Sequence, residues 1–173
     1  MTTNQDISSA SEVPRHWLEI DISQQRCRLW RDDKLDFEAL VSTALNGAGE
    51  QMNSGCTPRG WHVIRAKIGA DKPLNTVFIG RRPTGEIFSP ALFSQFPQRD
   101  WILSRILWLS GLERGKNRLG NVDTMRRYIY IHGCPDAVPL GKPLSHGCIR
   151  MHNQDLLTLF DKVPPGLKVW LHE

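Results

Sequence analysis

The sequence predicts one mainly β domain, and three observations support this fold class. Short runs of alternating apolar and polar residues recur along the first 80 residues, where Gly and Pro separate them. The same stretch shows no helical period. With 173 residues, 40% of them hydrophobic, the chain can bury one core but is too short for two ordinary domains.

The N-terminal half is expected to form five short strands. Residues 17–22 and 27–30 alternate on either side of a polar Ser-Gln-Gln turn, which is typical of a β-hairpin. The other three strands are expected at residues 37–43, 61–64 and 76–79. These segments predict a chain that meanders from one strand to the next.

The C-terminal half combines strands with one helix. Residues 101–109 fit either a short helix or a buried strand, and we favour the strand. Residues 128–131 are apolar, β-branched or aromatic, so they predict a strand that delivers His132 to a turn. Residues 153–163 begin with an asparagine suited to an N-cap and carry apolar side chains on one face, so they predict a helix. Residues 167–171 alternate and are expected to close the sheet.

Residues 1–15 are rich in Ser and Thr and are expected to form a flexible leader before a domain at residues 16–173. The leader has neither a basic n-region nor an apolar h-region, so a secretory signal peptide is not expected. No run approaches the length of an apolar membrane span, and no membrane partner is expected. If Met1 is the natural start, the sequence predicts a cytoplasmic protein.

Charge and cysteine content narrow the function classes only slightly. The net charge of +4 suits acidic small substrates and nucleic acids equally well. The four cysteines are irregularly spaced, so no disulfide framework is expected in a reducing compartment. Cys27 and Cys56 are expected to be bystanders, whereas a disulfide between Cys134 and Cys148 is geometrically possible but would block the thiol.

Two short motifs carry the candidate chemistry: His132-Gly133-Cys134 and Ser145-His146-Gly147-Cys148-Ile149-Arg150. A cysteine nucleophile needs a base, because a free thiol is mostly protonated at neutral pH. His132 and His146 are the two candidates for that base. The N–H groups around Gly147 and Cys148 can form an oxyanion hole, and Arg150, two residues on, can bind a carboxylate. No acidic residue adjoins either histidine in the sequence.

Three other interpretations remain open at this point. The histidines and cysteines of the two motifs could bind zinc, although the H-x-C…H-x-C spacing is not a familiar structural site. Cys148 could also be buried and chemically idle. Residues 81–127 carry nine basic and four acidic residues, with Trp101 and Trp108, which suggests a remote alternative, an RNA-binding module. No nucleic-acid motif accompanies them, so no nucleic acid partner is expected and these arginines are expected to be solvated surface.

The pair of motifs closely resembles the signature of the L,D-transpeptidase catalytic domain, or YkuD-like, family. The similarity includes Ile131 and Met151 at the motif ends, and it extends to residues 41–43 and 56–64 and to the N-terminal strands. It accounts for roughly residues 16–173. The resemblance implies a β-sandwich-like sheet assembly with one or two short helices, in agreement with the strand pattern.

The resemblance also implies roles for individual residues. Cys148 would be the nucleophile, His132 its base, and the Gly133 carbonyl would orient that base as an aspartate does in other triads. Arg150 would bind a substrate carboxylate. Support for the site is expected from Ser145, His146 and Gly147. No metal or cofactor is implied, no binding residue is transferred within residues 81–127, and the oligomeric state stays open.

The substrate implied by the resemblance is a stem tetrapeptide of peptidoglycan. The thiolate attacks the carbonyl of the diamino acid at position 3, D-Ala leaves, and an acyl-enzyme remains. A cytoplasmic enzyme would meet soluble muropeptides, so we expect water as the acceptor: an L,D-carboxypeptidase that releases terminal D-Ala in murein recycling. The alternative is an L,D-transpeptidase that forms 3→3 cross-links or exchanges D-amino acids.

Overall fold

The computed structural model describes residues 13–173, so the expected leader lies outside the described residues except for its last three. The strands are β1 (His16–Asp21), β2 (Arg26–Arg31), β3 (Lys34–Leu40), β4 (Gly60–Ile68), β5 (Thr76–Ile79), β6 (Arg82–Ile87), β7 (Ile102–Gly111), β8 (Tyr130–Cys134), β9 (Ile149–His152) and β10 (Lys168–His172). The helices are α1 (Pro90–Gln95), α2 (Asn153–Lys162) and the 3-10 turn η1 (Gly120–Val122). The predicted mainly β class with one or two short helices is confirmed. No helix among residues 13–173 is long and apolar enough to cross a membrane.

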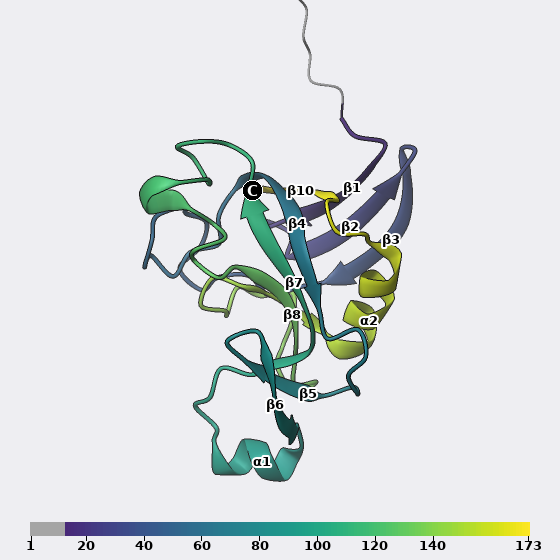
Figure 1. Cartoon of the computed structure of the whole chain (residues 1–173), viewed down its shortest axis with the longest axis vertical. Coiled ribbons are helices and arrows are strands. Elements are labelled where there is room, and N and C mark those ends of the chain that lie inside the picture. The colour runs from purple at the N-terminus through teal and green to yellow at the C-terminus, as the bar shows by residue number, and fades with distance from the viewer. Residues whose placement is uncertain (1–12) are drawn as a thin grey trace, which may run out of the picture.

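All ten strands belong to one curled sheet. The order is β3-β2-β1-β10-β4-β7-β5-β6, and β8 and β9 branch from β7. Two pairs are parallel, β1 with β10 and β8 with β9, and the others are antiparallel. Figure 1 shows the β5–β6 hairpin and α1 at one end of the molecule and β1 to β3 at the other.

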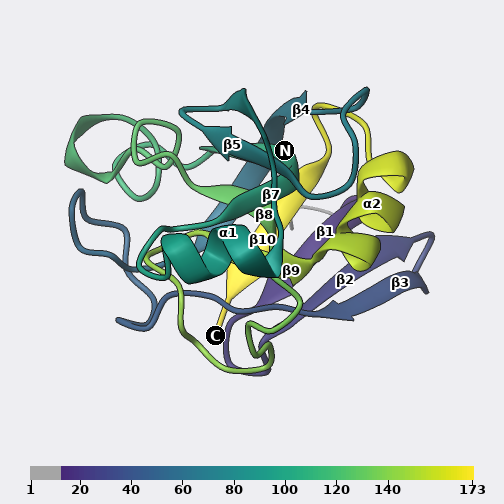
Figure 2. The same ribbon diagram turned by 90° about the horizontal axis from the view of Figure 1, so that it is seen from below.

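The main core lies where α2 covers the curled sheet (Figure 2). The inward positions of β1, β2 and β10 alternate with outward ones, as the sequence pattern requires, and they meet the apolar face of α2. Fully buried members of this core include Leu18, Leu29, Leu156, Leu159 and Val169. The core therefore forms a rigid base under β7, β8 and β9, the strands that carry the site.

Several predicted elements are confirmed with small shifts. The hairpin of residues 17–22 and 27–30, the strands at 61–64, 76–79 and 167–171, and the helix from residue 153 are all present. Residues 101–109 form a strand, as favoured, within the long β7. The strand expected at 37–43 instead covers 34–40. Beyond it, Ser42 forms an isolated bridge with Arg150 of β9, and Ala44 forms one with Ser145 in the loop before β9.

Two local predictions are wrong. The strand expected at residues 128–131 starts only at Tyr130 and runs through His132 to Cys134, because Tyr128 has φ 56° and closes a turn. The N-cap of α2 is His152 rather than Asn153. The Asn153 amide instead bonds to the Ser104 hydroxyl and the Cys134 carbonyl, which draws it into the interior.

Candidate active site

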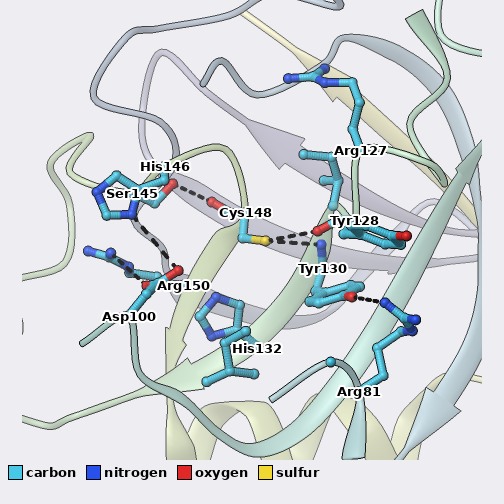
Figure 3. Close-up of a pocket in the computed structure, with 13 residues that line it drawn as sticks. Arg81, Asp100, Arg127, Tyr128, Tyr130, His132, Ser145, His146, Cys148 and Arg150 are labelled. Carbon is cyan, nitrogen blue, oxygen red and sulfur yellow. Dashed lines mark hydrogen bonds and ion pairs between the residues drawn. The ribbon is translucent and has the colours of Figure 1, made fainter. Parts of the chain in front are cut away.

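Parallel pairing of β8 and β9 brings the two sequence motifs together. His132 on β8 pairs in register with Arg150 on β9, and the loop that leads into β9 carries Ser145 to Cys148. All the predicted site residues with polar side chains line one pocket of about 500 Å³ (Figure 3). The pocket is lined by Gly80, Arg81, Asp100, Ile102, Arg127, Tyr128, Ile129, Tyr130, His132, Ser145, His146, Cys148 and Arg150.

His132 is held in one tautomer by its neighbour. The side chain is 1% exposed, and its Nδ1 lies 2.7 Å from the Gly133 carbonyl oxygen. A carbonyl only accepts, so Nδ1 carries the proton and Nε2 is left as the basic nitrogen. Burial is the main cause that lowers the pKa of His132 below its ordinary value. The imidazole is therefore neutral at pH 7.

Cys148 lines the same pocket as this imidazole (Figure 3) and is partly exposed. Its Sγ accepts a hydrogen bond from the Tyr130 N–H at 3.3 Å and donates one to the Tyr128 carbonyl at 3.3 Å. Burial raises the pKa of the Cys148 thiol to about 12, although the Tyr130 N–H acts in the opposite direction. The resting pair is thus a thiol and a neutral imidazole.

Hydrogen bonds fix the shape of the loop before Cys148. The Ser145 hydroxyl donates to the Cys148 carbonyl at 2.5 Å and accepts from the Gly147 N–H at 3.2 Å. Thr57 donates its hydroxyl to the Gly147 carbonyl at 2.9 Å. Since the Gly147 N–H is bonded to Ser145, the Cys148 N–H is the remaining member of the pair expected to bind an oxyanion.

Glycine is required at both motif positions that carry it. Gly147 has φ +132°, and a Cβ there would lie 3.3 Å from the Cys56 carbonyl oxygen. A Cβ on Gly133 would lie 2.5 Å from the Leu103 carbonyl oxygen. Positive φ therefore explains Gly147, and close backbone approach explains Gly133.

Arg150 finds its acidic partner far away in the sequence. Its Nη2 lies 3.3 Å from Asp100 Oδ1, and Nη1 donates to the Leu144 carbonyl at 3.3 Å. Asp100 Oδ2 lies 3.9 Å from Nδ1 of His146, whose side chain is 77% exposed at the pocket rim. The two candidate bases thus differ: His132 is buried and oriented, and His146 is exposed and near an acid that the local sequence does not reveal.

Sequence reasoning missed the residues on the other side of the pocket. Arg127 donates to the carbonyls of Gly49 at 3.1 Å and Cys56 at 2.5 Å, and burial lowers its pKa. Arg81 donates to the Tyr130 hydroxyl at 2.9 Å. In the sequence, Gly80 follows the strand at 76–79 and indicates a turn there. It does not indicate that this turn reaches the pocket.

The zinc interpretation is wrong, because the histidines and cysteines of the two motifs do not bring three donor atoms together. Within the described part of the chain, only Glu19, Asp21 and His172 place three donor atoms within 4.8 Å of one another. The Arg28 guanidinium lies 3.7 Å from Glu19 and 3.5 Å from Asp21, so it already pairs with both carboxylates of that group. The alternative Cys134–Cys148 disulfide is not formed either, because both cysteines are free.

Comparison with known proteins decides the family. A family model described as "YkuD: L,D-transpeptidase catalytic domain" matches residues 15–171. The chain belongs to this family. It is 40% identical over 47 residues to the "Putative L,D-transpeptidase YkuD" of Bacillus subtilis, a match of 27% of this chain and 29% of that protein. It is 44% identical over 43 residues to the "Probable L,D-transpeptidase YbiS" of Escherichia coli, a match of 25% and 14% of the two chains.

Solved structures show the same fold. L,D-transpeptidase 3 from Mycobacterium tuberculosis, in complex with a faropenem-derived adduct, superposes with a TM-score of 0.57 at 18% identity, over 92% of this chain and 61% of that one. An L,D-transpeptidase from Mycobacterium smegmatis superposes with a TM-score of 0.54 at 18% identity, over 92% and 59%. The chain thus spans about three-fifths of these neighbours and under a third of the curated relatives that it matches.

Proposed function

We propose that this family member is a cysteine acyl-transfer enzyme that releases the terminal D-Ala from soluble peptidoglycan stem tetrapeptides, an L,D-carboxypeptidase of murein recycling in the cytoplasm. One observation carries the proposal. Cys148 and a buried His132 line the same pocket, and the Nδ1–Gly133 bond leaves Nε2 of His132 as the basic nitrogen. A thiol and a histidine base in one pocket are the two groups that cysteine acyl transfer requires.

In the first half-reaction, Cys148 Sγ bonds to the carbonyl carbon of the diamino acid as its proton passes to Nε2 of His132. Because the pKa of the thiol is raised and that of the imidazole is lowered, proton transfer accompanies the attack rather than preceding it. The same proton then goes to the D-Ala nitrogen as the C–N bond breaks. A thioester on Cys148 and free D-Ala result.

In the second half-reaction, Nε2 of His132 takes a proton from water, whose oxygen attacks the thioester carbon. The C–S bond breaks, the proton returns to sulfur, and the tripeptide leaves. Throughout, the Gly133 carbonyl holds the Nδ1–H at 2.7 Å, so it performs the orienting role that an aspartate has in Ser-His-Asp triads.

Charge in the pocket supports water as the acceptor. Arg81, Arg127 and Arg150 line it against a single acid, Asp100. A net positive lining attracts a donor peptide that carries carboxylates. It disfavours the ammonium group through which a second stem peptide enters as acceptor, whereas water is not affected.

Product analysis tests the proposal. Purified protein is incubated with a disaccharide-tetrapeptide, alone and with an excess of a second stem peptide, and products are identified by mass spectrometry. We expect D-Ala and tripeptide in both cases, with a minor share of transfer products. Predominant cross-linked dimer would contradict hydrolysis and support the transpeptidase alternative, and no turnover in either case would contradict both.

A further inference from the structure

Arg81 lies at the tip of the β5–β6 hairpin and faces the pocket that contains Cys148. Only Gly80 and Arg81 separate the two strands, and both have positive φ, 56° and 65°. This is the pattern of a type I′ turn, whose positions favour Gly, Asn or Asp. An arginine in this conformation is disfavoured locally, and such residues cluster at functional sites.

Aromatic rings hold the Arg81 guanidinium in place. Its Cζ lies 4.7 Å from the ring centroid of Trp108 and 4.7 Å from that of Tyr128. Nη1 donates to the Tyr130 hydroxyl at 2.9 Å. Cation–π contacts and this bond restrict a side chain that is otherwise flexible, so a ligand would meet it already ordered.

No acid among the described residues neutralises Arg81. Among residues 13–173, no carboxylate oxygen lies within 4.0 Å of Arg81, whereas Arg150 has Asp100 at 3.3 Å. A guanidinium has five N–H donors, and the bond to Tyr130 uses one of them. Arg81 therefore presents an uncompensated charge with donors to spare, and the chemical class that it fits is a carboxylate.

Tyr130 places this charge close to the nucleophile. Its hydroxyl accepts from Arg81, and its backbone N–H donates to Cys148 Sγ at 3.3 Å. In Figure 3, Arg81 and Arg150 lie on either side of Cys148. One residue thus links the cation to the reacting sulfur.

We propose that Arg81 is a specificity-determining residue that binds a carboxylate of the donor peptide on the side of Cys148 opposite Arg150. The inference rests on the proposed function, since it assumes a stem peptide as substrate. Two carboxylates qualify, that of the terminal D-Ala and that on the side chain of a diamino dicarboxylic acid at position 3. Both present the same chemistry to a guanidinium.

The test uses Arg81→Asn, because asparagine tolerates positive φ and the variant keeps the turn. We expect it to raise KM for tetrapeptide roughly tenfold or more, the usual worth of a hydrogen bond to a charged group, with a much smaller change in kcat. Arg81→Lys should restore part of the affinity. The exposed neighbour Arg82, which does not line the pocket, supplies the matched control Arg82→Asn, for which KM should not change.

Two substrate analogues identify the carboxylate, one with the terminal carboxyl and one with the side-chain carboxyl as a carboxamide. On one of the two analogues, the KM of the wild type should rise above its value for the acid. The KM of Arg81→Asn should be the same for that analogue as for the acid. That analogue names the group that Arg81 binds. An equal rise in KM on the acid and both amides, or no rise on the acid, would overturn the inference.

A measurement without substrate separates failure of this inference from failure of the proposed function. Cys148 is alkylated with anionic iodoacetate and with neutral iodoacetamide. Arg81→Asn should lower the iodoacetate rate relative to iodoacetamide by roughly threefold, as for a partly exposed ion pair. An unchanged ratio contradicts anion binding by Arg81 even if tetrapeptide is not turned over, and a lowered ratio supports it.

Discussion

The pocket has two walls that are built in different ways. The nucleophile wall is held by backbone pairing of β8 with β9 and by hydrogen bonds within one loop, and its pocket-lining residues are His132, Ser145, His146, Cys148 and Arg150. The arginine wall is assembled from side chains of the β5–β6 turn, the segment before β8 and the first residue of β8: Arg81, Arg127, Tyr128 and Tyr130. The difference suggests a division of labour, in which one wall performs the chemistry and the other selects the substrate.

If this division holds, the largest effect belongs to the nucleophile wall. Cys148→Ala should lower turnover of tetrapeptide by at least roughly a thousandfold, since no other thiol can take its place. The melting temperature should stay close to that of wild type, because the side chain is partly exposed. Steady-state kinetics and thermal unfolding measure the two quantities.

Cys56→Ala is the matched control, a cysteine that is also partly exposed but does not line the pocket. It should keep most of the activity. A comparable loss in this variant would point to a structural thiol network instead of a single nucleophile.

The two histidines should differ sharply. His132→Asn replaces Nδ1–H by an amide that can still donate to the Gly133 carbonyl, but it removes the base, so kcat should fall about 10²–10⁴-fold. His146→Asn should cost far less, because that side chain is 77% exposed at the rim. Should the His146 variant lose more activity, the assignment of the base is reversed.

The pH profile sharpens the same assignment. In the proposed mechanism only neutral His132 can act as the base. Burial lowers the pKa of His132, so it stays neutral to a lower pH than an ordinary histidine. The acid limb of kcat/KM should therefore lie below pH 6.5, with activity rising as pH rises through it. An acid limb above pH 6.5 would contradict His132 as the base.

The smallest effect is expected at the pocket rim beside Arg150. Asp100→Asn removes the acid that pairs with Arg150 at 3.3 Å and makes the pocket more positive. KM for tetrapeptide should fall about two- to fivefold, as expected for a half-exposed ion pair. Asp71→Asn, an exposed acid outside the pocket, should leave KM unchanged, and a rise in KM for Asp100→Asn would mean that the pair itself holds the substrate.

The walls also differ in how far the sequence could predict them. The residues of the nucleophile wall all lie in two short sequence motifs. Their residue types and spacing were therefore enough to identify them from the sequence. The arginine wall depends on where the tip of the β5–β6 hairpin lies in three dimensions. β6 is an exposed edge strand with Pro83 and Gly85, so it shows no clear alternation, and α1 is only six residues long.

The two wrong local predictions have the same physical origin. Asn153 is a good N-cap residue by type, but buried Ser104 and the Cys134 carbonyl compete for its amide. Tyr128 has high strand propensity, yet the turn that ends at Tyr128 forces positive φ there. In both cases the surrounding structure overrode the preference of the residue type: tertiary hydrogen bonds at Asn153 and a turn at Tyr128.

The most direct test of the central claim is the acyl-enzyme itself. Protein mixed with excess tetrapeptide is quenched in acid within the first turnovers, and its intact mass and tryptic peptides are measured. We predict an added mass equal to the tripeptide acyl group, located on Cys148, which builds up in His132→Asn more slowly than in wild type and never forms in Cys148→Ala. Release of D-Ala by Cys148→Ala at the wild-type rate, or an adduct located on Cys27, Cys56 or Cys134, would contradict the account.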